Sequence, residues 1–169
     1  MKKLKAIIVD DELHARENLK YLLQDYCPEI NVIGMAADPG EAIALVAATQ
    51  PDLIFLDICM PSGTEGFEML DSIPDKKFQV VFVTAFKDNA IRALNANAVR
   101  HLQKPVDVDD LISVVESVID THELFCKNRV ELLNYVRSLE GLSQAMYSKV
   151  PPSMITSCGS GSPSAFSRL

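Results

Sequence analysis

The chain has 169 residues, of which 48% are hydrophobic and 7% aromatic, so it holds enough apolar material for one domain of ordinary size and an appendage, but not for a second full domain. Its net charge of -7 leaves no broad cationic surface that could displace the counterions of a nucleic acid, which disfavours direct DNA binding by this chain. No apolar stretch is long enough to span a bilayer or resembles a signal peptide, and the four cysteines lack the C-x-x-C spacing of a zinc site, so we expect no membrane contact and a reducing, cytoplasmic setting.

The first predicted strand, 4–9, is an apolar, β-branched run that ends at Asp10 and Asp11. Uninterrupted apolar character is typical of a parallel strand that is buried on both faces. Apolar residues then recur at helical spacing over 12–26, before Pro28, and predict the first helix. Acidic side chains therefore stand at the carboxyl end of this strand.

A second strand is predicted over 31–37, followed by an alanine-rich helix over 41–49. Asp38 precedes a proline and is placed to cap this helix at its N-terminus. The third predicted strand, 53–57, is again apolar along its length and again stops at an aspartate, Asp57.

The second half of the domain continues the alternation. A loop over 60–63 leads to a short helix over 67–73 and then to a fourth strand over 79–83, which ends at Thr84. The segment 88–97 is weakly helical in pattern.

The fifth strand is predicted over 99–102, and Lys104 follows it before a proline. A strongly amphipathic last helix is predicted over 111–122, started by Asp107 or Asp109.

Five strands that alternate with five helices over 1–121 predict an α/β fold, a doubly wound parallel sheet with strand order 2-1-3-4-5 and helices on both faces. In such a sheet the functional crevice lies outside the carboxyl ends of the strands, where the order reverses between the first and the third. The strand-terminal aspartates are predicted to lie there.

The remainder divides into two segments. Apolar residues over 122–140 predict a helical connector that either extends the last helix or forms a separate one. The segment 141–169 is rich in Gly, Ser and Pro and poor in periodic apolar positions, so we expect it to be disordered or loosely packed.

Three aspartates from two strand ends, Asp10, Asp11 and Asp57, are expected to converge in this topology, and their charges repel unless a cation compensates them. Oxygen ligands that are few in number suit a hard divalent cation such as Mg²⁺, or Mn²⁺, better than zinc or copper. The alternative is that these aspartates are helix caps and solvated loop residues, which suits Asp11 alone about as well but suits the converging set less.

Thr84 and Lys104 end the fourth and fifth strands at the same edge. A carboxylate nucleophile, a metal ion, a hydroxyl and a cation together meet the needs of phosphoryl transfer, in which catalysis consists mainly of positioning and charge neutralisation. Taken singly, Thr84 fits an ordinary strand residue and Lys104 a solvated surface charge.

Four motifs in this order and spacing resemble the receiver domain of bacterial response regulators over 1–121. They are Val9-Asp10-Asp11-Glu12, Leu56-Asp57-Ile58-Cys59-Met60-Pro61, Val83-Thr84-Ala85 and Lys104-Pro105. Each motif is weak alone, but the series is highly specific. The resemblance implies a flavodoxin-like (βα)5 fold and a phosphoacceptor that assists its own modification, without turnover of a separate substrate.

The resemblance also implies a role for each site residue. Asp57 is expected to accept the phosphoryl group. The expected Mg²⁺ ligands are Asp10, Asp11, Asp57 and the main-chain carbonyl of Cys59. Lys104 is expected to pair with the phosphoryl oxygens.

Further expectations concern the switch residues that couple phosphorylation of Asp57 to a change of the protein surface. Thr84 is expected to be the switch hydroxyl, and His101 stands where the family usually has an aromatic residue, so either it rotates toward Thr84 or it has no switch role. The peptide bond between Lys104 and Pro105 is expected to be cis. We also hypothesise that the bulk of Phe86 slows self-dephosphorylation.

In their amino-acid sequence, the segments 84–86, 90–94 and 101–105 most resemble receivers of the LytTR (LytR/AlgR) class, which carry a C-terminal DNA-binding output domain. We expect that output domain to be missing here, through truncation or an altered reading frame after about Lys149, and the alternative is a natural single-domain regulator with a tail. The expected partners are a sensor histidine kinase that docks near the first helix, and a second copy bound through the face of the 88–97 segment, the fifth strand and the last helix.

Three other functions remain alternatives. A hydrolase with an aspartyl nucleophile generally has a second aspartate two residues later, but Cys59 stands there. A flavin-binding protein of the same fold lacks support because Asp10 and Asp11 would repel a flavin phosphate. The third alternative is a pseudo-receiver that binds proteins without being phosphorylated.

Overall fold

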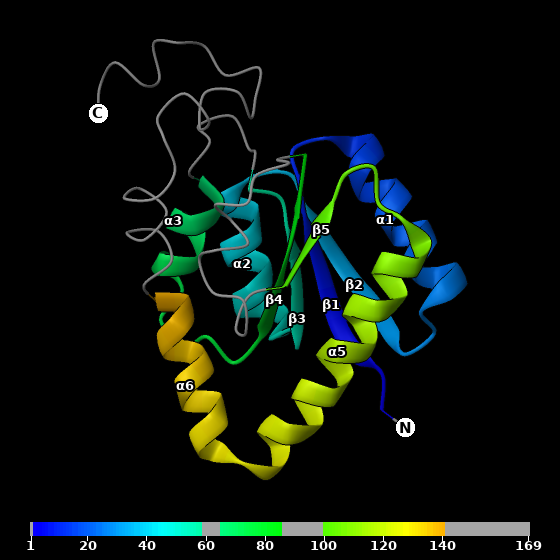
Figure 1. Ribbon diagram of the computed structural model, residues 1–169. Helices are drawn as coiled ribbons and strands as arrows, with labels where there is room; N and C mark the ends of the chain where they lie inside the picture. The colour runs from blue at the N-terminus through cyan, green and yellow to red at the C-terminus, as the bar shows by residue number, and fades with distance from the viewer. Residues whose placement is uncertain (1, 59–64, 86–99, 141–169) are drawn as a thin grey trace.

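The structure is a computed structural model that describes residues 2–58, 65–85 and 100–140 (Figure 1). The predicted loop at 60–63, the 88–97 segment and the 141–169 tail lie outside these residues. In the described part of the chain, no helix is both long enough and apolar enough to cross a membrane.

A parallel sheet of five strands forms the centre of the domain, in the order β2-β1-β3-β4-β5 (Figure 1). Every neighbouring pair of strands runs parallel. The strands are β1 (Leu4–Val9), β2 (Ile30–Ala36), β3 (Leu53–Leu56), β4 (Gln79–Thr84) and β5 (Arg100–Gln103). The predicted fold class and strand order are therefore confirmed, with the second and fifth strands displaced by one residue from the predicted ranges.

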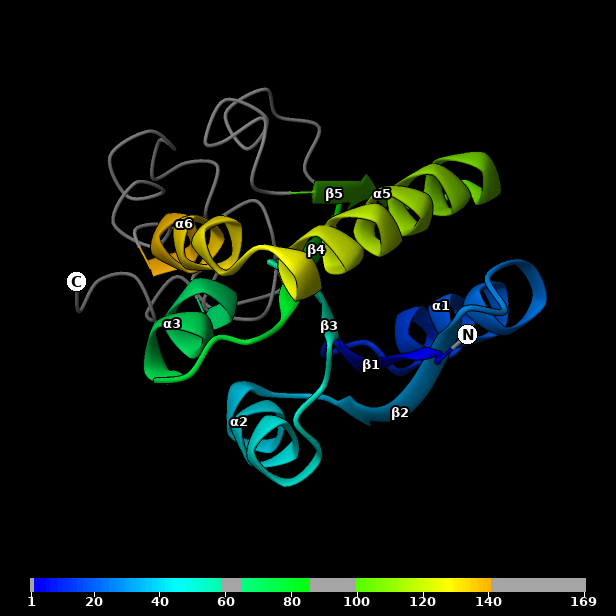
Figure 2. The ribbon, with the colours of Figure 1, turned by 90° about the horizontal axis from the view of Figure 1, so that it is seen from below.

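The described helices cover both faces of this sheet (Figure 2). One face carries α1 (Leu13–Tyr26) and α5 (Val108–Lys127), and the other carries α2 (Pro39–Thr49), α3 (Glu65–Ser72) and α6 (Arg129–Glu140). Because a right-handed crossover changes face when the strand order reverses, α1 and α2 lie on opposite sides of β1.

Two hydrophobic clusters lie between the sheet and its two helical layers. In β1, Ile7 and Val9 belong to the cluster under α2 and α3, whereas Ala6 and Ile8 belong to the cluster under α1 and α5. Successive strand residues point to opposite faces, so a strand that is covered on both sides must be apolar along its whole length. This accounts for the continuous apolar runs in the sequence.

The predicted helix caps are present. Asp38 accepts a hydrogen bond from Glu41 N at 2.8 Å at the start of α2. Asp107 accepts from Asp109 N and Asp110 N at 2.9 and 3.2 Å, so it is Asp107, not Asp109, that caps α5.

The predicted range of the last helix, 111–122, was too short. α5 runs from Val108 to Lys127, because its cap lies at Asp107 and its apolar pattern continues to Phe125, which packs against the core. The helix α5 ends at Lys127, with Asn128 as its C-cap, and the chain continues as the separate helix α6. The segment 122–140 thus does both things that the sequence allowed: its first residues extend the last helix, and the rest form a separate helix. The domain boundary at 121 remains a prediction.

Candidate functional site

Two of the predicted carboxylates directly follow strands that lie side by side. Asp10 follows β1 and Asp57 follows β3, and the two strands pair in parallel. Asp57 N donates to Val9 O at 2.8 Å, and Asp10 N donates to Ala36 O at 3.1 Å, so ladder-type bonds hold both backbones. Asp10 and Asp57 are 4% and 2% exposed. The sheet thus buries two negatively charged groups at one edge.

Asp11 completes the cluster on its exposed side. Asp10, Asp11 and Asp57 each offer one carboxylate oxygen, and these oxygens lie within 4.8 Å of one another. Partial burial, and then the negative charge of Asp10, raise the pKa of Asp11. The charged form of Asp11 is thus disfavoured first by its loss of water and then by its neighbour Asp10.

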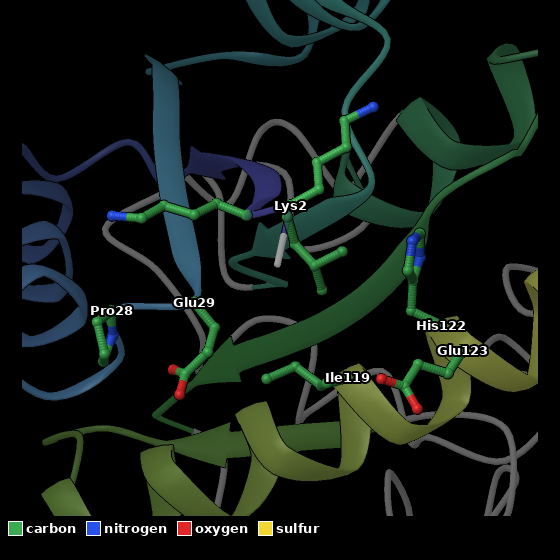
Figure 3. Close-up of a pocket in the computed structure, with 8 residues that line it drawn as sticks. Lys2, Pro28, Glu29, Ile119, His122 and Glu123 are labelled. Atoms are coloured by element: carbon green, nitrogen blue, oxygen red, sulfur yellow. The ribbon is translucent and has the colours of Figure 1, made fainter.

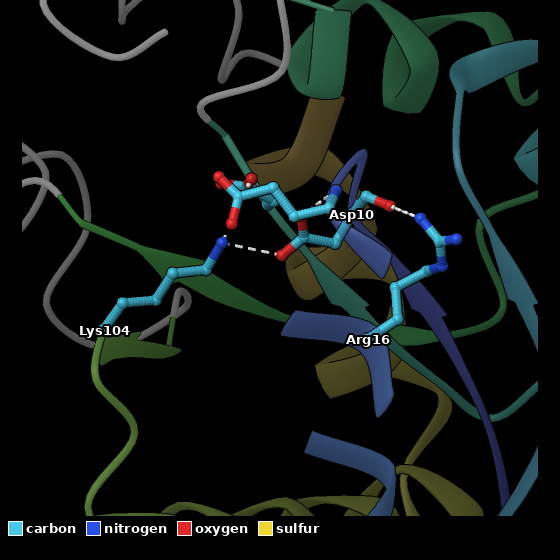
Figure 4. Close-up of polar contacts among 5 residues, drawn as sticks. Asp10, Arg16 and Lys104 are labelled. Atoms are coloured by element: carbon cyan, nitrogen blue, oxygen red, sulfur yellow. Dashed lines mark hydrogen bonds and ion pairs between the residues drawn. The ribbon is translucent and has the colours of Figure 1, made fainter. Parts of the chain in front are cut away.

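Asp10 is held at both its carboxylate and its main chain (Figure 4). Its Oδ1 accepts from Glu12 N at 2.9 Å and its Oδ2 accepts from Lys104 Nζ at 2.7 Å. Arg16, on the second turn of α1, donates from Nη1 to the carbonyl oxygen of Asp10 at 2.6 Å. The sequence analysis missed Arg16, whose only signal was its place in the helix that follows Asp11.

Lys104 brings the positive charge. It follows β5, its backbone N donates to Thr84 O at 2.8 Å, and its Nζ lies 3.3 Å from Asp57 Oδ2. Burial alone lowers the pKa of Lys104, but the hydrogen bond to Asp10 and the charge of Asp57 outweigh it, so the pKa is raised. The Lys104–Pro105 peptide bond is cis, as predicted.

The two proposed switch residues lie on neighbouring strands. Thr84, 1% exposed, is the last residue of β4 and pairs with Gln103 of β5. His101 is half-buried and pairs with Phe82, two residues further from the carboxyl edge. The structure therefore brings Thr84 to the acidic edge, while the rotation of His101 toward it remains a prediction. Cys59 and Phe86 lie outside the described residues.

The donor set fits a hard divalent cation. Among the described residues, three carboxylates lie together and two of them, Asp10 and Asp57, pair with the ammonium group of Lys104, so negative charge is in excess and the side-chain ligands of this cluster are all oxygens. Mg²⁺ prefers oxygen ligands and is usually bound by a few carboxylates with waters in the remaining positions. A partly exposed Asp11 leaves room for such waters.

A hollow of about 370 Å³ lies at the opposite end of the sheet (Figure 3). Its lining is mainly apolar and includes Lys2, Glu29, His122 and Glu123. The lysines and glutamates among the lining residues carry charges of both signs and form no cluster of one sign. The carboxylate cluster at the other end is therefore the better candidate for chemistry.

The chain matches the family model described as "Response regulator receiver domain" over residues 6–116. It belongs to this family and is a receiver domain of a two-component response regulator. An uncharacterized response regulatory protein from Vibrio cholerae is 41% identical over 122 residues, which cover 71% of this chain and 50% of the relative.

Other curated relatives are regulators of transcription by name. The transcriptional regulatory protein BtsR from Salmonella typhimurium is 45% identical over 106 residues, which cover 62% of this chain and 43% of BtsR. The chain thus spans about half the length of the curated relatives that it matches.

Solved structures show the same fold. A two-component response regulator of the LuxR family from Aurantimonas has a TM-score of 0.60 at 27% identity, covering 71% of this chain and 87% of that one. The CheX-CheY-BeF3-Mg+2 complex from Borrelia burgdorferi contains a chain with a TM-score of 0.60 at 26% identity, covering 70% of this chain and 90% of that one.

Proposed function

We propose that Asp57 accepts a phosphoryl group from a phosphorylated histidine of a sensor kinase, with Mg²⁺ or Mn²⁺ held by Asp10, Asp11 and Asp57. The observation that carries this proposal is the convergence of three carboxylates within 4.8 Å, two of them buried, beside one ammonium group. The main-chain carbonyl of Cys59 is a further proposed ligand. A bound divalent cation supplies positive charge that neutralises the transferred oxygens.

In the proposed reaction, a carboxylate oxygen of Asp57 attacks the phosphorus in line. The new P–O bond forms as the P–N bond to the donor imidazole breaks, and the imidazole leaves with the electron pair. Lys104, 3.3 Å from Asp57 Oδ2, is placed to neutralise a phosphoryl oxygen. Arg16 and Glu12 keep Asp10 in position through its carbonyl and carboxylate.

The proposed output is a change of partner rather than turnover of a separate substrate. Thr84 and His101 would transmit the conformational effect of the added charge to the face of the 88–97 segment, β5 and α5. We propose that this face binds a second copy of the protein. The full-length protein would then control an output domain of the LytTR type. Two observations support an output domain in the full-length protein: the matched region covers only about half of the curated relatives, and BtsR is named a transcriptional regulator. We propose that the chain acts in the cytoplasm.

Intact-mass spectrometry after incubation with acetyl phosphate and Mg²⁺ tests this function. The unmodified chain should gain one phosphoryl group, and Asp57→Asn should gain none. Asp25→Asn, which removes an exposed carboxylate of α1, is the matched control and should be modified as the wild type is. An adduct that persists in Asp57→Asn would show that the acceptor is wrong. Absence of any Mg²⁺-dependent adduct would favour a pseudo-receiver that binds partners without phosphorylation.

A further inference from the structure

The helix α6 lies against the body of the domain through one of its faces. Tyr135 and Leu139 are 6% and 0% exposed, whereas Val130 and Leu133 are 62% and 50% exposed. Residues four apart share a helix face, so Tyr135 and Leu139 form the buried side. Figures 1 and 2 both place α6 beside α3, and these two helices are in contact.

The surface that receives α6 is part of the hydrophobic cluster between the sheet, α2 and α3. We call it the α3–β4 surface, and its members on these two elements are Met69, Leu70, Val80 and Phe82. Tyr135 and Leu139 belong to the same cluster. Docking of α6 therefore buries apolar area that would otherwise face water, which stabilises the docked position.

Tyr135 anchors the helix by a directed bond as well as by packing. Val80 N donates to Tyr135 Oη at 2.7 Å, and the ring of Phe125 on α5 lies with its centroid 5.2 Å from that of Tyr135. Burial raises the pKa of Tyr135 to about 12, although the bond from Val80 and the charge of Arg100 lower it. The hydroxyl is therefore neutral at physiological pH, and the anchor does not depend on a charge.

The strand β4 joins this anchor to the acidic site. It carries Val80 near its start and Thr84 at its end, which at about 3.3 Å per residue places them roughly 13 Å apart. Ile58, the residue after Asp57, is 0% exposed and belongs to the cluster that α6 joins. The two sites thus share a strand and a packed group of side chains.

We propose that the docking of α6 on the α3–β4 surface is coupled to the state of Asp57, so that α6 is docked on the unmodified protein and is released when Asp57 is phosphorylated. This proposal rests on the proposed function. A phosphoryl group brings charge and oxygen atoms that Thr84 and Lys104 can reach, and a shift at the end of β4 or at Ile58 alters the packed cluster. Since α6 fits the surface of the unmodified state, such a change weakens its docking.

Hydrogen exchange on the full chain measures the release directly. The rate of amide exchange in peptides from α6 is compared between the chain with Mg²⁺ alone and the chain with Mg²⁺ and beryllofluoride, a mimic of the phosphoryl group. We expect exchange in α6 to rise about fivefold or more, the lower end of a typical coupling between sites. Peptides from α1, on the other face of the sheet, should change less than twofold.

Variants of α6 test the coupling from the opposite direction. Tyr135→Phe keeps the ring but leaves Val80 N without its acceptor, so α6 should exchange faster in the unmodified protein. Because coupling between two binding equilibria is reciprocal, the same variant should bind beryllofluoride and Mg²⁺ more tightly, by at least about threefold. Leu133→Ala, on the exposed side of the same helix, is the matched control and should alter neither quantity.

The outcomes separate this proposal from the proposed function. If acetyl phosphate forms the Asp57 adduct but α6 exchanges at the same rate with and without beryllofluoride, the coupling is refuted and the proposed function stands. If no adduct forms, the proposed function fails, and the coupling is then decided by beryllofluoride alone. In that case, equal beryllofluoride affinities of Tyr135→Phe and the wild type, both measured with Mg²⁺, would overturn it.

Discussion

The two ends of the sheet both bury polar groups, but they satisfy them differently. At the amino end, Arg100 donates to Gln79 Oε1, to the main-chain and side-chain oxygens of Ser117, and to Thr121 Oγ1. Gln79 Nε2 donates in turn to Val118 O at 2.9 Å. At this end, one cation meets neutral acceptors that α5 and β4 supply, and no like charges face each other among the groups named.

At the carboxyl end, the same sheet gathers charge in excess. In the described part of the chain, Asp10 and Asp57 share the ammonium group of Lys104, and Asp11 lies beside them with a pKa that is raised first by burial and then by the charge of Asp10. A structural network gains nothing from such repulsion, because each buried charge costs free energy unless it is paired. The amino end therefore serves stability, whereas the carboxyl end lacks positive charge that a bound cation can supply.

Replacing Arg100 by Met should give the largest loss of stability. It removes the donor from Gln79 and from three oxygens of α5, and the Gln79 acceptor stays buried, so we expect a loss of about 2–3 kcal/mol in the free energy of unfolding. Urea denaturation followed by circular dichroism measures it. Arg137→Met, on the exposed side of α6, is the matched control and should cost less than about 0.5 kcal/mol. Equal effects of the two variants would refute a structural role for the amino-end network.

Replacing Lys104 by Met should cost about 2 kcal/mol without Mg²⁺, because Asp10 and Asp57 then repel each other without a compensating charge. Added Mg²⁺ should recover much of this loss, which identifies the carboxyl end as the site that lacks positive charge. In the wild type, the raised pKa of Lys104 means that its stabilisation is fully present at neutral pH and is lost only as pH rises through the raised value.

The matched control for Lys104→Met is Lys77→Met, whose ammonium lies 3.3 Å from Asp75 but whose side chain is 77% exposed. An exposed pair contributes little, so this loss should stay below about 1 kcal/mol and should not respond to Mg²⁺. If the two lysine variants behaved alike with and without Mg²⁺, the contrast between the ends of the sheet would not hold.

The last effect is confined to alkaline pH and concerns the titration of Tyr135. Tyr135 has a pKa raised to about 12, so the folded protein disfavours its phenolate and loses stability as pH rises above the ordinary tyrosine value. The loss should approach about 1.4 kcal/mol per pH unit from this group. Denaturation of the wild type and of Tyr135→Phe at several alkaline pH values measures it, because the variant lacks this titration. The stability difference between them should shrink as pH rises, and a constant difference would contradict the assignment.

Much of the fold could be predicted from the sequence. The apolar runs that end at Asp10 and Asp57 gave the first and third strands, and the right-handed crossover rule gave their order. The convergence of Asp10, Asp11, Thr84 and Lys104 followed from that order alone, since the carboxyl ends of parallel strands meet at one edge. Local pattern and topology were sufficient for these features.

Other features depended on contacts between distant residues. The bond from Arg16 to Asp10 and the anchor of Tyr135 on Val80 have no local signal, because they depend on how a helix packs against the sheet. The predicted connector over 122–140 was likewise a pattern of apolar residues without a known partner. Its docking on the α3–β4 surface depends on the burial of Tyr135 and Leu139 in the core, which no local pattern specifies.

By itself, the sequence determined which strands form, in which order they lie, and which charged side chains stand at the carboxyl edge, because these follow from local periodicity and chain connectivity. Only the tertiary structure decided how the charges pair, with Lys104 between Asp10 and Asp57, and which face of α6 is buried. The physical reason is that pairing and burial depend on distances between residues far apart in the chain, and those distances exist only once the sheet and its helices have packed together.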